Sequence, residues 1–251
     1  MIGAGISYYS TAAQENYLAG NAKIYDGSFD ADTINISTGI YEYNLASTTL
    51  LAFKWTPVVS SNRQHLFQVG DYGGGATRGV AFYIENGKLW CWFQNTQGVG
   101  IVISSDNLIT DVYNIVCITK STSSASSGIK IYINGVASPF SILFDSLNNN
   151  TLVPPQGNKW TIGARQGSDP ISGRFGGLIK QIEVANFEAT AGQITIATAQ
   201  GSLQALSLPF ADYLFSVDFN KTGTVAPTTR TGTPAYTITP TGGAAYTQYL
   251  P

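Results

Sequence analysis

Two strand-like runs meet at an Asn-Gly pair in Val80-Ala-Phe-Tyr-Ile-Glu-Asn-Gly-Lys-Leu-Trp-Cys-Trp-Phe93. Asn-Gly supplies the two positive-φ residues that a type I′ hairpin turn requires, and the β-branched and aromatic residues on either side favour extended strands. The same pattern returns in Ile129-Lys-Ile-Tyr-Ile-Asn-Gly-Val-Ala137. Both segments predict antiparallel hairpins and indicate an all-β chain.

Short apolar runs punctuated by Gly, Asn and Pro extend this pattern along most of the chain, whereas helical periodicity is nearly absent. The predicted strands outside the two hairpins are residues 33–36, 48–55, 64–69, 99–104, 113–120, 160–162, 175–184 and 213–219. Such spacing, with turn residues between the strands, favours an antiparallel two-sheet sandwich.

Charged residues are scarce. The chain has 13 Lys and Arg and 15 Asp and Glu among 251 residues, whereas a typical soluble protein of this size carries about 60 charged residues. No run approaches the roughly 20 apolar residues of a membrane span, and a net charge of -2 argues against nucleic-acid binding. A hydrophobic content of 43% also argues against disorder. We therefore expect a globular protein with no nucleic-acid partner and no membrane insertion.

The order of these segments resembles the concanavalin A-like lectin/glucanase superfamily in its laminin-G-like branch. The resemblance covers about residues 20 to 205 and implies a jelly-roll sandwich of two curved antiparallel sheets. The segments that carry it are residues 24–36, Leu50-Leu-Ala-Phe-Lys-Trp-Thr-Pro57, Asp111-Val-Tyr-Asn-Ile-Val-Cys-Ile-Thr119, residues 129–136, Trp160-Thr-Ile-Gly-Ala-Arg165, residues 175–184 and Ala189-Thr-Ala-Gly-Gln-Ile194.

The composition shifts near the C-terminus, where the last 32 residues include only two charged ones, Lys221 and Arg230. The predicted organisation is an N-terminal extension over residues 1–20, a jelly-roll domain over residues 21–219 and a Thr/Pro-rich tail over residues 220–251. We expect the tail to lie along neighbouring subunits. Its expected assembly anchors are Tyr236, Tyr246 and Tyr249.

One strand carries two tryptophans with a common orientation. Alternation places Trp90 and Trp92 on one face and Leu89, Cys91 and Phe93 on the other. If the second set points into the core, the tryptophans are displayed where sugar rings can stack; the open alternative is a strand covered on both faces. A polar-aromatic patch suited to a neutral glycan would be completed by Tyr83, Tyr72, Asp71, Arg78 and Gln94.

Catalytic residues are not expected. Superfamily members that hydrolyse glucans carry paired carboxylates on one strand face, about 5 Å apart in retaining enzymes. The candidate segment offers only Glu183 and Glu188, whose odd separation puts them on opposite faces of a regular strand. The single histidine, His65, lacks a motif for a nearby nucleophile, so we expect it to face solvent or to be hydrogen-bonded on its strand. A glycoside hydrolase is the least favoured function.

Calcium is the one cofactor left open; otherwise none is expected. Asp26, Asp30 and Asp32 lie within seven residues, and oxygen-rich loops of this kind can bind calcium. Their spacing does not match an EF-hand, and Asp is also a common turn former. Asp71 and Asp169 are further loose candidates.

The two cysteines, Cys91 and Cys117, lie in apolar strand-like runs. The first residues contain no basic stretch, because the first positive charge is Lys23, and so do not resemble a secretory signal. We expect synthesis in the cytoplasm and buried free thiols rather than a disulfide.

These features predict a non-enzymatic structural and binding protein of a virus particle, namely a bacteriophage capsid decoration, fibre or tail component with a lectin-like domain. Such a protein is made in the host cytoplasm and works in the virion, which reconciles a surface chemistry typical of extracellular proteins with the absence of an export signal. The expected partners are other virion proteins or copies of the same chain, and host-surface or mucosal glycans. The alternative is a free extracellular carbohydrate-binding module.

Overall fold

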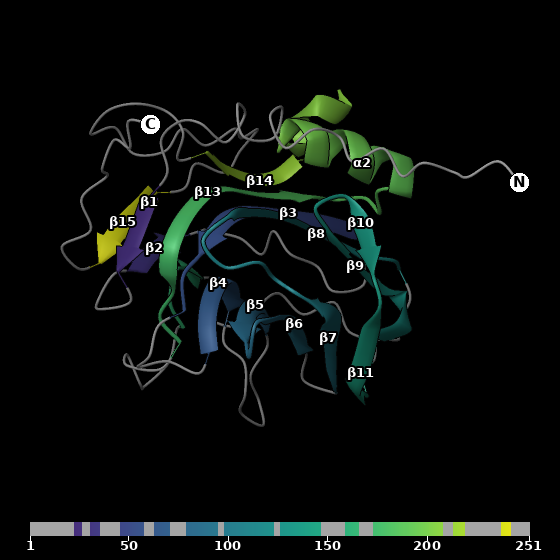
Figure 1. Ribbon diagram of the computed structural model, residues 1–251, viewed down its shortest axis with the longest axis horizontal. Coiled ribbons are helices and arrows are strands. Elements are labelled where there is room, and N and C mark those ends of the chain that lie inside the picture. Colours follow the sequence, from purple (N-terminus) through teal and green to yellow (C-terminus); the bar gives the residue numbers. More distant parts are fainter. Residues whose placement is uncertain are drawn as a thin grey trace, which may run out of the picture.

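Two antiparallel sheets face each other in the computed structural model, and helix α2 lies on the outside of one of them (Figure 1). The structure describes residues 23–26, 31–35, 46–57, 63–70, 79–94, 98–122, 126–146, 159–165, 173–207, 213–218 and 237–241. No helix of this described part is long and apolar enough to cross a membrane.

Each sheet combines strands from distant parts of the chain. The seven-stranded sheet has, in spatial order, β1 (Lys23–Asp26), β13 (Gly176–Ala185), β3 (Ser47–Trp55), β8 (Tyr113–Lys120), β9 (Ile129–Ile133) and β10 (Val136–Ser138), with β14 (Tyr213–Asp218) also beside β13. The eight-stranded sheet has β11 (Phe140–Asp145), β7 (Val99–Asn107), β6 (Lys88–Gln94), β5 (Gly79–Glu85), β4 (Arg63–Gly70), β12 (Lys159–Ile162), β2 (Ala31–Asn35) and β15 (Thr237–Thr241).

The all-β sandwich and both Asn-Gly hairpins are confirmed. The β5–β6 turn places Asn86 at φ 54° and Gly87 at φ 75°, and the β9–β10 turn places Asn134 at φ 51° and Gly135 at φ 81°. Two consecutive positive φ angles define the type I′ turn, whose twist matches that of the flanking strands. The eight other predicted strands are all present, with ends shifted by at most a few residues.

The main core lies between the two sheets and is rich in aromatic side chains. Phe53 and Phe175 meet edge to face with ring centroids 6.0 Å apart, and Phe82 meets Phe93 in the same way at 5.9 Å. All four are fully buried. Burial of each such ring stabilises the fold by about 1.5–3 kcal/mol, so this layer holds the two sheets together.

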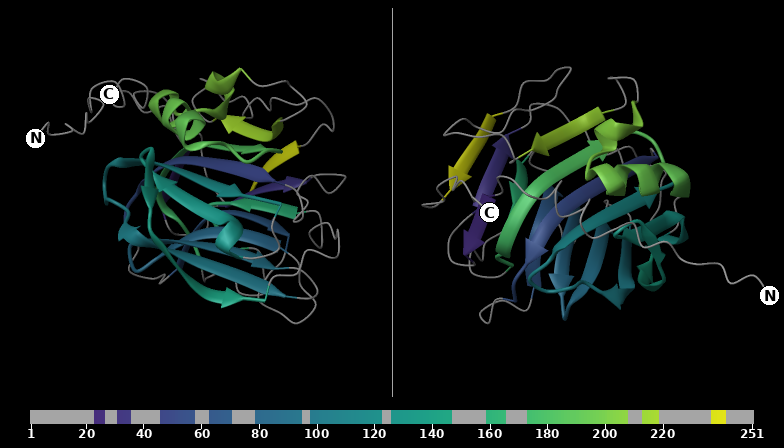
Figure 2. Two further views of the ribbon diagram at one scale, coloured as in Figure 1. Left: turned by 90° about the vertical axis from the view of Figure 1, so that its right-hand side faces the viewer. Right: turned by 45° about the horizontal axis from the view of Figure 1, so that its top comes forward.

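A second apolar cluster covers the outer face of the seven-stranded sheet. Helix α2 (Ala191–Gln200) and the 3₁₀ turn η2 (Leu203–Leu206) lie over this sheet (Figure 2, right). They bury Ile194, Ala197 and Leu203 against Leu50 and other sheet residues. Helix α2 was not predicted from the sequence. Its few buried positions form only a narrow stripe, so the segment shows little helical periodicity.

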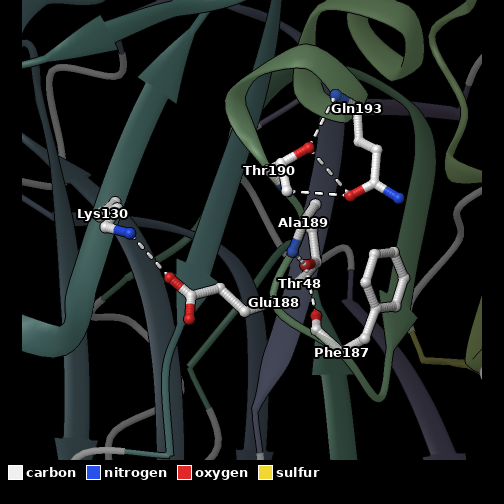
Figure 3. A network of polar contacts seen from close by, with 7 residues as sticks. All are labelled: Thr48, Lys130, Phe187, Glu188, Ala189, Thr190 and Gln193. Carbon is white, nitrogen blue, oxygen red and sulfur yellow. Dashed lines mark hydrogen bonds and ion pairs between the residues drawn. The ribbon is translucent and has the colours of Figure 1, made fainter.

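Local hydrogen bonds determine where α2 begins and ends. The Thr190 side chain accepts a bond from the backbone N–H of Gln193, and the Gln193 side chain accepts one from the backbone N–H of Thr190, which is a capping box (Figure 3). Gly201 ends the helix in the left-handed conformation at φ 63°. The capping interactions at both ends stabilise this helix, although its threonines and isoleucines do not favour helical structure.

The segment before α2 is fastened to both β3 and β9 (Figure 3). The Thr48 hydroxyl donates to the carbonyl of Phe187 at 2.6 Å and accepts from the backbone N–H of Ala189 at 2.9 Å. Lys130 Nζ lies 2.8 Å from Glu188 Oε1. The helix is therefore anchored at its entry as well as along its apolar stripe.

Two strands of the eight-stranded sheet were not predicted. β11 occupies an apolar stretch directly after the second hairpin and pairs with β7. β15 lies within the Thr/Pro-rich tail and pairs with β2, from near the other end of the chain. The predicted region boundaries themselves stay a prediction.

Candidate functional site

Aromatic side chains gather on the face of the eight-stranded sheet that points away from the main core. Leu89, Cys91 and Phe93 of β6 belong to the main core, whereas Trp90 and Trp92 pack on the opposite face in a separate small cluster. This is the orientation that strand alternation predicts. Both indoles are partly buried, so they are neither fully displayed nor fully covered.

Trp90 is held by a stack of rings that crosses three strands. His65, Tyr83 and Trp90 are directly opposite one another on β4, β5 and β6. The His65 and Tyr83 ring centroids lie 5.0 Å apart and those of Tyr83 and Trp90 lie 5.7 Å apart, with both pairs near parallel. The Arg63 guanidinium carbon lies 5.6 Å from the Tyr83 centroid. Since Tyr83 is fully buried, its ring braces Trp90 instead of facing solvent.

His65, at one end of this stack, is fully buried, which excludes the solvent-facing alternative of the two that the sequence left open. Burial lowers its pKa to about 3, with smaller contributions from the charges of Arg165 and Arg63. The histidine is therefore neutral at physiological pH. Its backbone N–H donates to the carbonyl of Gly173 at 2.9 Å. A Cβ on Gly173 would lie 2.5 Å from the His65 ring, so only glycine leaves room for it.

Trp92 is fixed by a polar neighbour. Its indole Nε1 donates to Gln94 Oε1 at 3.1 Å, and Gln94 is itself buried. At the other end of these strands, Arg63 Nε lies 3.1 Å from Glu85 Oε1. We call Trp90 and Trp92, together with the buried Tyr83 and Gln94 that support them and the adjacent Arg63, the aromatic face. It combines two half-buried indoles with hydrogen-bonding groups at both ends.

Two of the three predicted calcium ligands lie on strands of different sheets. Asp26 lies on β1 opposite Gly176, in the seven-stranded sheet, and Asp32 lies on β2 opposite Ile162, in the other sheet. Among the described residues, no group of three or more His, Cys, Asp and Glu could hold a metal ion. The predicted residues that lie outside the described ranges are Asp30, Asp71, Tyr72, Arg78, Asp169, Tyr236, Tyr246 and Tyr249.

Glu183 is fully buried on β13 and engaged by surrounding donors. Gln181 Nε2 donates to it at 2.8 Å, Ser202 Oγ lies 3.0 Å away, and the backbone N–H of Leu203 and the Gln204 amide also donate to it. It thereby caps the start of η2. Since Glu188 lies beyond the end of β13 and pairs with Lys130, the two carboxylates have separate structural partners. Sequence reasoning missed this role of Glu183, because three of its four donors come from about 20 residues further along the chain.

Both cysteines are free and buried, as predicted. Cys91 lies in the main core, and Cys117 lies beneath α2 with its sulfur 4.0 Å from the Thr198 hydroxyl oxygen. Burial raises the pKa of both thiols, that of Cys117 to about 12. Burial therefore keeps both thiols in the protonated form at neutral pH.

The model of the Concanavalin A-like lectin/glucanases superfamily matches residues 26–195. Because this match spans more than half of the chain, the chain belongs to that superfamily. No curated protein matches it in sequence.

Solved structures with similar folds include several binding domains. A putative carbohydrate binding protein from Bacteroides ovatus has a TM-score of 0.57 at 14% identity, with 90% of this chain and 61% of that chain covered. The CBM40 domain of a Ruminococcus gnavus sialidase has a TM-score of 0.53 at 16% identity, covering 71% and 96%. A heptameric SAP-like pentraxin from Limulus polyphemus has a TM-score of 0.50 at 14% identity, covering 72% and 82%. At these identities the similarity concerns the fold, which is lectin-like.

Proposed function

We propose that the chain is a non-catalytic carbohydrate-binding domain that receives a neutral glycan on the aromatic face. The observation that carries this proposal is the pair of half-buried indoles, Trp90 and Trp92, side by side on the sheet face opposite the core. The apolar C–H face of a sugar ring stacks on an aromatic ring, while its hydroxyl groups need donors and acceptors nearby.

The aromatic face is held in position before a ligand arrives. Tyr83 supports Trp90 from behind, and Gln94 holds the indole of Trp92. A ring that is already fixed loses little side-chain freedom on binding, which favours affinity. The charged pair Arg63 and Glu85 can hydrogen-bond hydroxyl groups while adding no net charge, which suits an uncharged sugar.

A similar fold with a known ligand supports the glycan-binding part of this proposal, whereas the choice of a neutral sugar rests on the aromatic face itself. The Ruminococcus gnavus CBM40 domain has been solved bound to alpha2,6 sialyllactose, with a TM-score of 0.53. The absence of enzymatic activity is supported by Glu183 and Glu188, whose oxygens accept hydrogen bonds from other parts of the fold. Because Glu183 is fully buried, its carboxylate cannot reach a glycosidic bond, and the segment then offers only Glu188 where glycoside hydrolysis needs a pair.

Glycan-array binding followed by calorimetry on the strongest hit tests the proposal. We expect Trp90→Ala and Trp92→Ala each to weaken binding at least tenfold, with an unchanged circular-dichroism spectrum. Tyr113→Ala is the matched control, because Tyr113 is also a half-buried aromatic residue but lies at the end of β8 in the other sheet. Full binding by both tryptophan variants would remove the aromatic face as the binding site.

We propose further that this domain is a component of a virus particle: it is made in the host cytoplasm and displayed in the virion. The alternative is a free extracellular module. The low charge of the chain, 28 charged residues among 251, supports the virion setting, because uncharged surfaces are buried against neighbouring subunits at a small desolvation cost. The test is co-sedimentation with purified particles. The chain should sediment with them and be released when Tyr236, Tyr246 and Tyr249 are all changed to Ala. Recovery only in the free fraction would contradict the virion role.

A further inference from the structure

β11 ends the eight-stranded sheet within the described part of the chain and displays apolar side chains to solvent. Ile142, Leu143 and Phe144 are consecutive and are 42%, 51% and 56% exposed. Val136 on β10, which ends the other sheet, is 69% exposed. Figure 2 (left) looks onto this side of the sandwich. An exposed strand edge of this composition is a ready template for pairing with another strand.

This edge lacks the charges that normally prevent such pairing. From Val136 to Phe144 the chain contains no charged residue, whereas natural edge strands commonly carry lysine or an inward-pointing charge. The first charge is on Asp145, whose carboxylate already accepts a hydrogen bond from the backbone N–H of Ser126 at 2.7 Å. An uncharged apolar edge favours an uncharged apolar partner, and this chain offers one in its own β11.

The open part of β11 is short. The register against β7 shifts between Ile142 and Phe144, and the Ser126 hydroxyl of η1 (Ser126–Gly128) hydrogen-bonds to the carbonyl of Phe144. A bulge and a covering turn both limit backbone pairing at that end of the strand. Side-chain packing around Leu143 would therefore contribute more to an interface than a long backbone ladder.

We propose that a second copy of this chain docks on β11, with the two β11 strands antiparallel about a twofold axis. An antiparallel pair of identical strands is self-complementary, because the axis places the same three apolar residues of each copy against those of the other. No like charges oppose each other in this arrangement.

The size of the edge sets the strength of the dimer. A six-residue strand is about 20 Å long, and two sheets about 10 Å apart with their side chains present an edge roughly 20 Å wide. On the order of 400 Å² per copy is then available, about half of what a standard stable interface buries on each partner. We therefore expect a weak, concentration-dependent dimer.

Such a dimer would make glycan binding bivalent, a consequence that rests on the proposed function. Phe144 pairs with Ile101, which pairs with Trp92, so the outer row of β11 continues the aromatic face. A twofold axis perpendicular to the sheet keeps both aromatic faces on the same side. Two linked sites then bind a multivalent surface more tightly than one alone.

Sedimentation velocity of the full chain, from about 1 µM to several hundred µM and without glycan, tests the dimer independently of the proposed function. We expect the dimer fraction to grow with protein concentration. Leu143→Glu should raise the dissociation constant of the dimer at least tenfold. Ile196→Glu is the matched control, because Ile196 is 52% exposed but lies on α2. A monomer at every concentration, or equal weakening by both variants, would overturn the proposal.

Cross-linking gives a second measurement that does not depend on how a buried charge is tolerated. Both native thiols are buried, so Leu143→Cys introduces the one accessible thiol among the described residues. The twofold axis predicts a covalent dimer on mild oxidation of Leu143→Cys and none of Ile196→Cys. No covalent dimer from Leu143→Cys, or equal yields from both variants, would contradict the β11 interface even if the chain dimerises in another way.

Discussion

Replacing Glu183 with alanine tests whether this buried carboxylate holds α2 and η2 on the sheet. Glu183→Ala removes the acceptor for Gln181, Ser202, Leu203 and Gln204. Gln181 and Leu203 are buried and cannot turn to water, and each unsatisfied buried donor costs about 1–3 kcal/mol. With the lost packing added, we expect the free energy of unfolding to fall by about 3–5 kcal/mol, a large part of a typical total of about 5–15 kcal/mol.

Urea unfolding monitored by tryptophan fluorescence measures this loss. A slope of about 3 kcal/mol per molar urea converts it into a midpoint lowered by roughly 1 M or more. Dye binding should also rise before global unfolding, because a loosened α2 exposes the apolar cluster beneath it. If the alanine variant does not fold, Glu183→Gln keeps the side-chain volume and should show a smaller loss.

The matched control is Glu188→Ala, five residues further along the chain. Glu188 pairs with Lys130, and the two side chains are 29% and 54% exposed. An exposed ion pair contributes at most about 1 kcal/mol. A Glu183→Ala effect no larger than that of Glu188→Ala would refute the role assigned to the buried carboxylate.

Three further expectations concern stability and reactivity. As pH falls from 6.5 to 5, the unfolded chain binds a proton at its single histidine while the folded chain, with the His65 pKa at about 3, does not. The free energy of unfolding should therefore drop by about 1.7 kcal/mol in urea titrations, and His65→Phe should remove that drop. Cys91 and Cys117 should not react with a thiol reagent in the folded protein and should react in denaturant, so labelling of the native state would contradict their burial. Gly177→Ala should lower the thermal midpoint, because its Cβ would lie 2.1 Å from the carbonyl oxygen of Lys54 at a φ of +131°, whereas Gly192→Ala, in open space on α2, should raise stability by about 0.5–1 kcal/mol.

Local patterns predicted the fold where the signal lay within a few residues. The Asn-Gly turns were recognisable because type I′ geometry demands two positive φ angles in succession. Helix α2 had its own local signals, Thr190 with Gln193 at the start and Gly201 at the end, but they were obscured by weak amphipathic periodicity. The pairing of β15 with β2 depends on contacts across about 200 residues, which no local pattern encodes.

The candidate site, like the fold, could be predicted from the sequence only where the signal was local. Alternation along β6 was sufficient to place Trp90 and Trp92 on one face. The Asn86-Gly87 turn already sets Trp90 opposite Tyr83. The full burial of Tyr83 also depends on His65 on its other side, and the register of β4 against β5, which shifts next to His65, is not visible in the sequence. Three of the four donors around Glu183 come from η2 and its N-cap Ser202, so its structural role also depended on tertiary packing.

The seven-stranded sheet lies between two apolar clusters, and this position constrains how the protein can diverge. All residues of β3 except Lys54, and all of β8 except Tyr113, are buried. Almost every substitution in these two strands would therefore disturb the packing of a buried side chain. On β6 the half-buried tryptophans alternate with core residues, so alternate positions of this strand are less constrained by packing than those of β3 and β8. Substitutions are therefore expected to accumulate on the outer face of one sheet while the other sheet preserves the architecture, consistent with a shared fold at 14–16% identity.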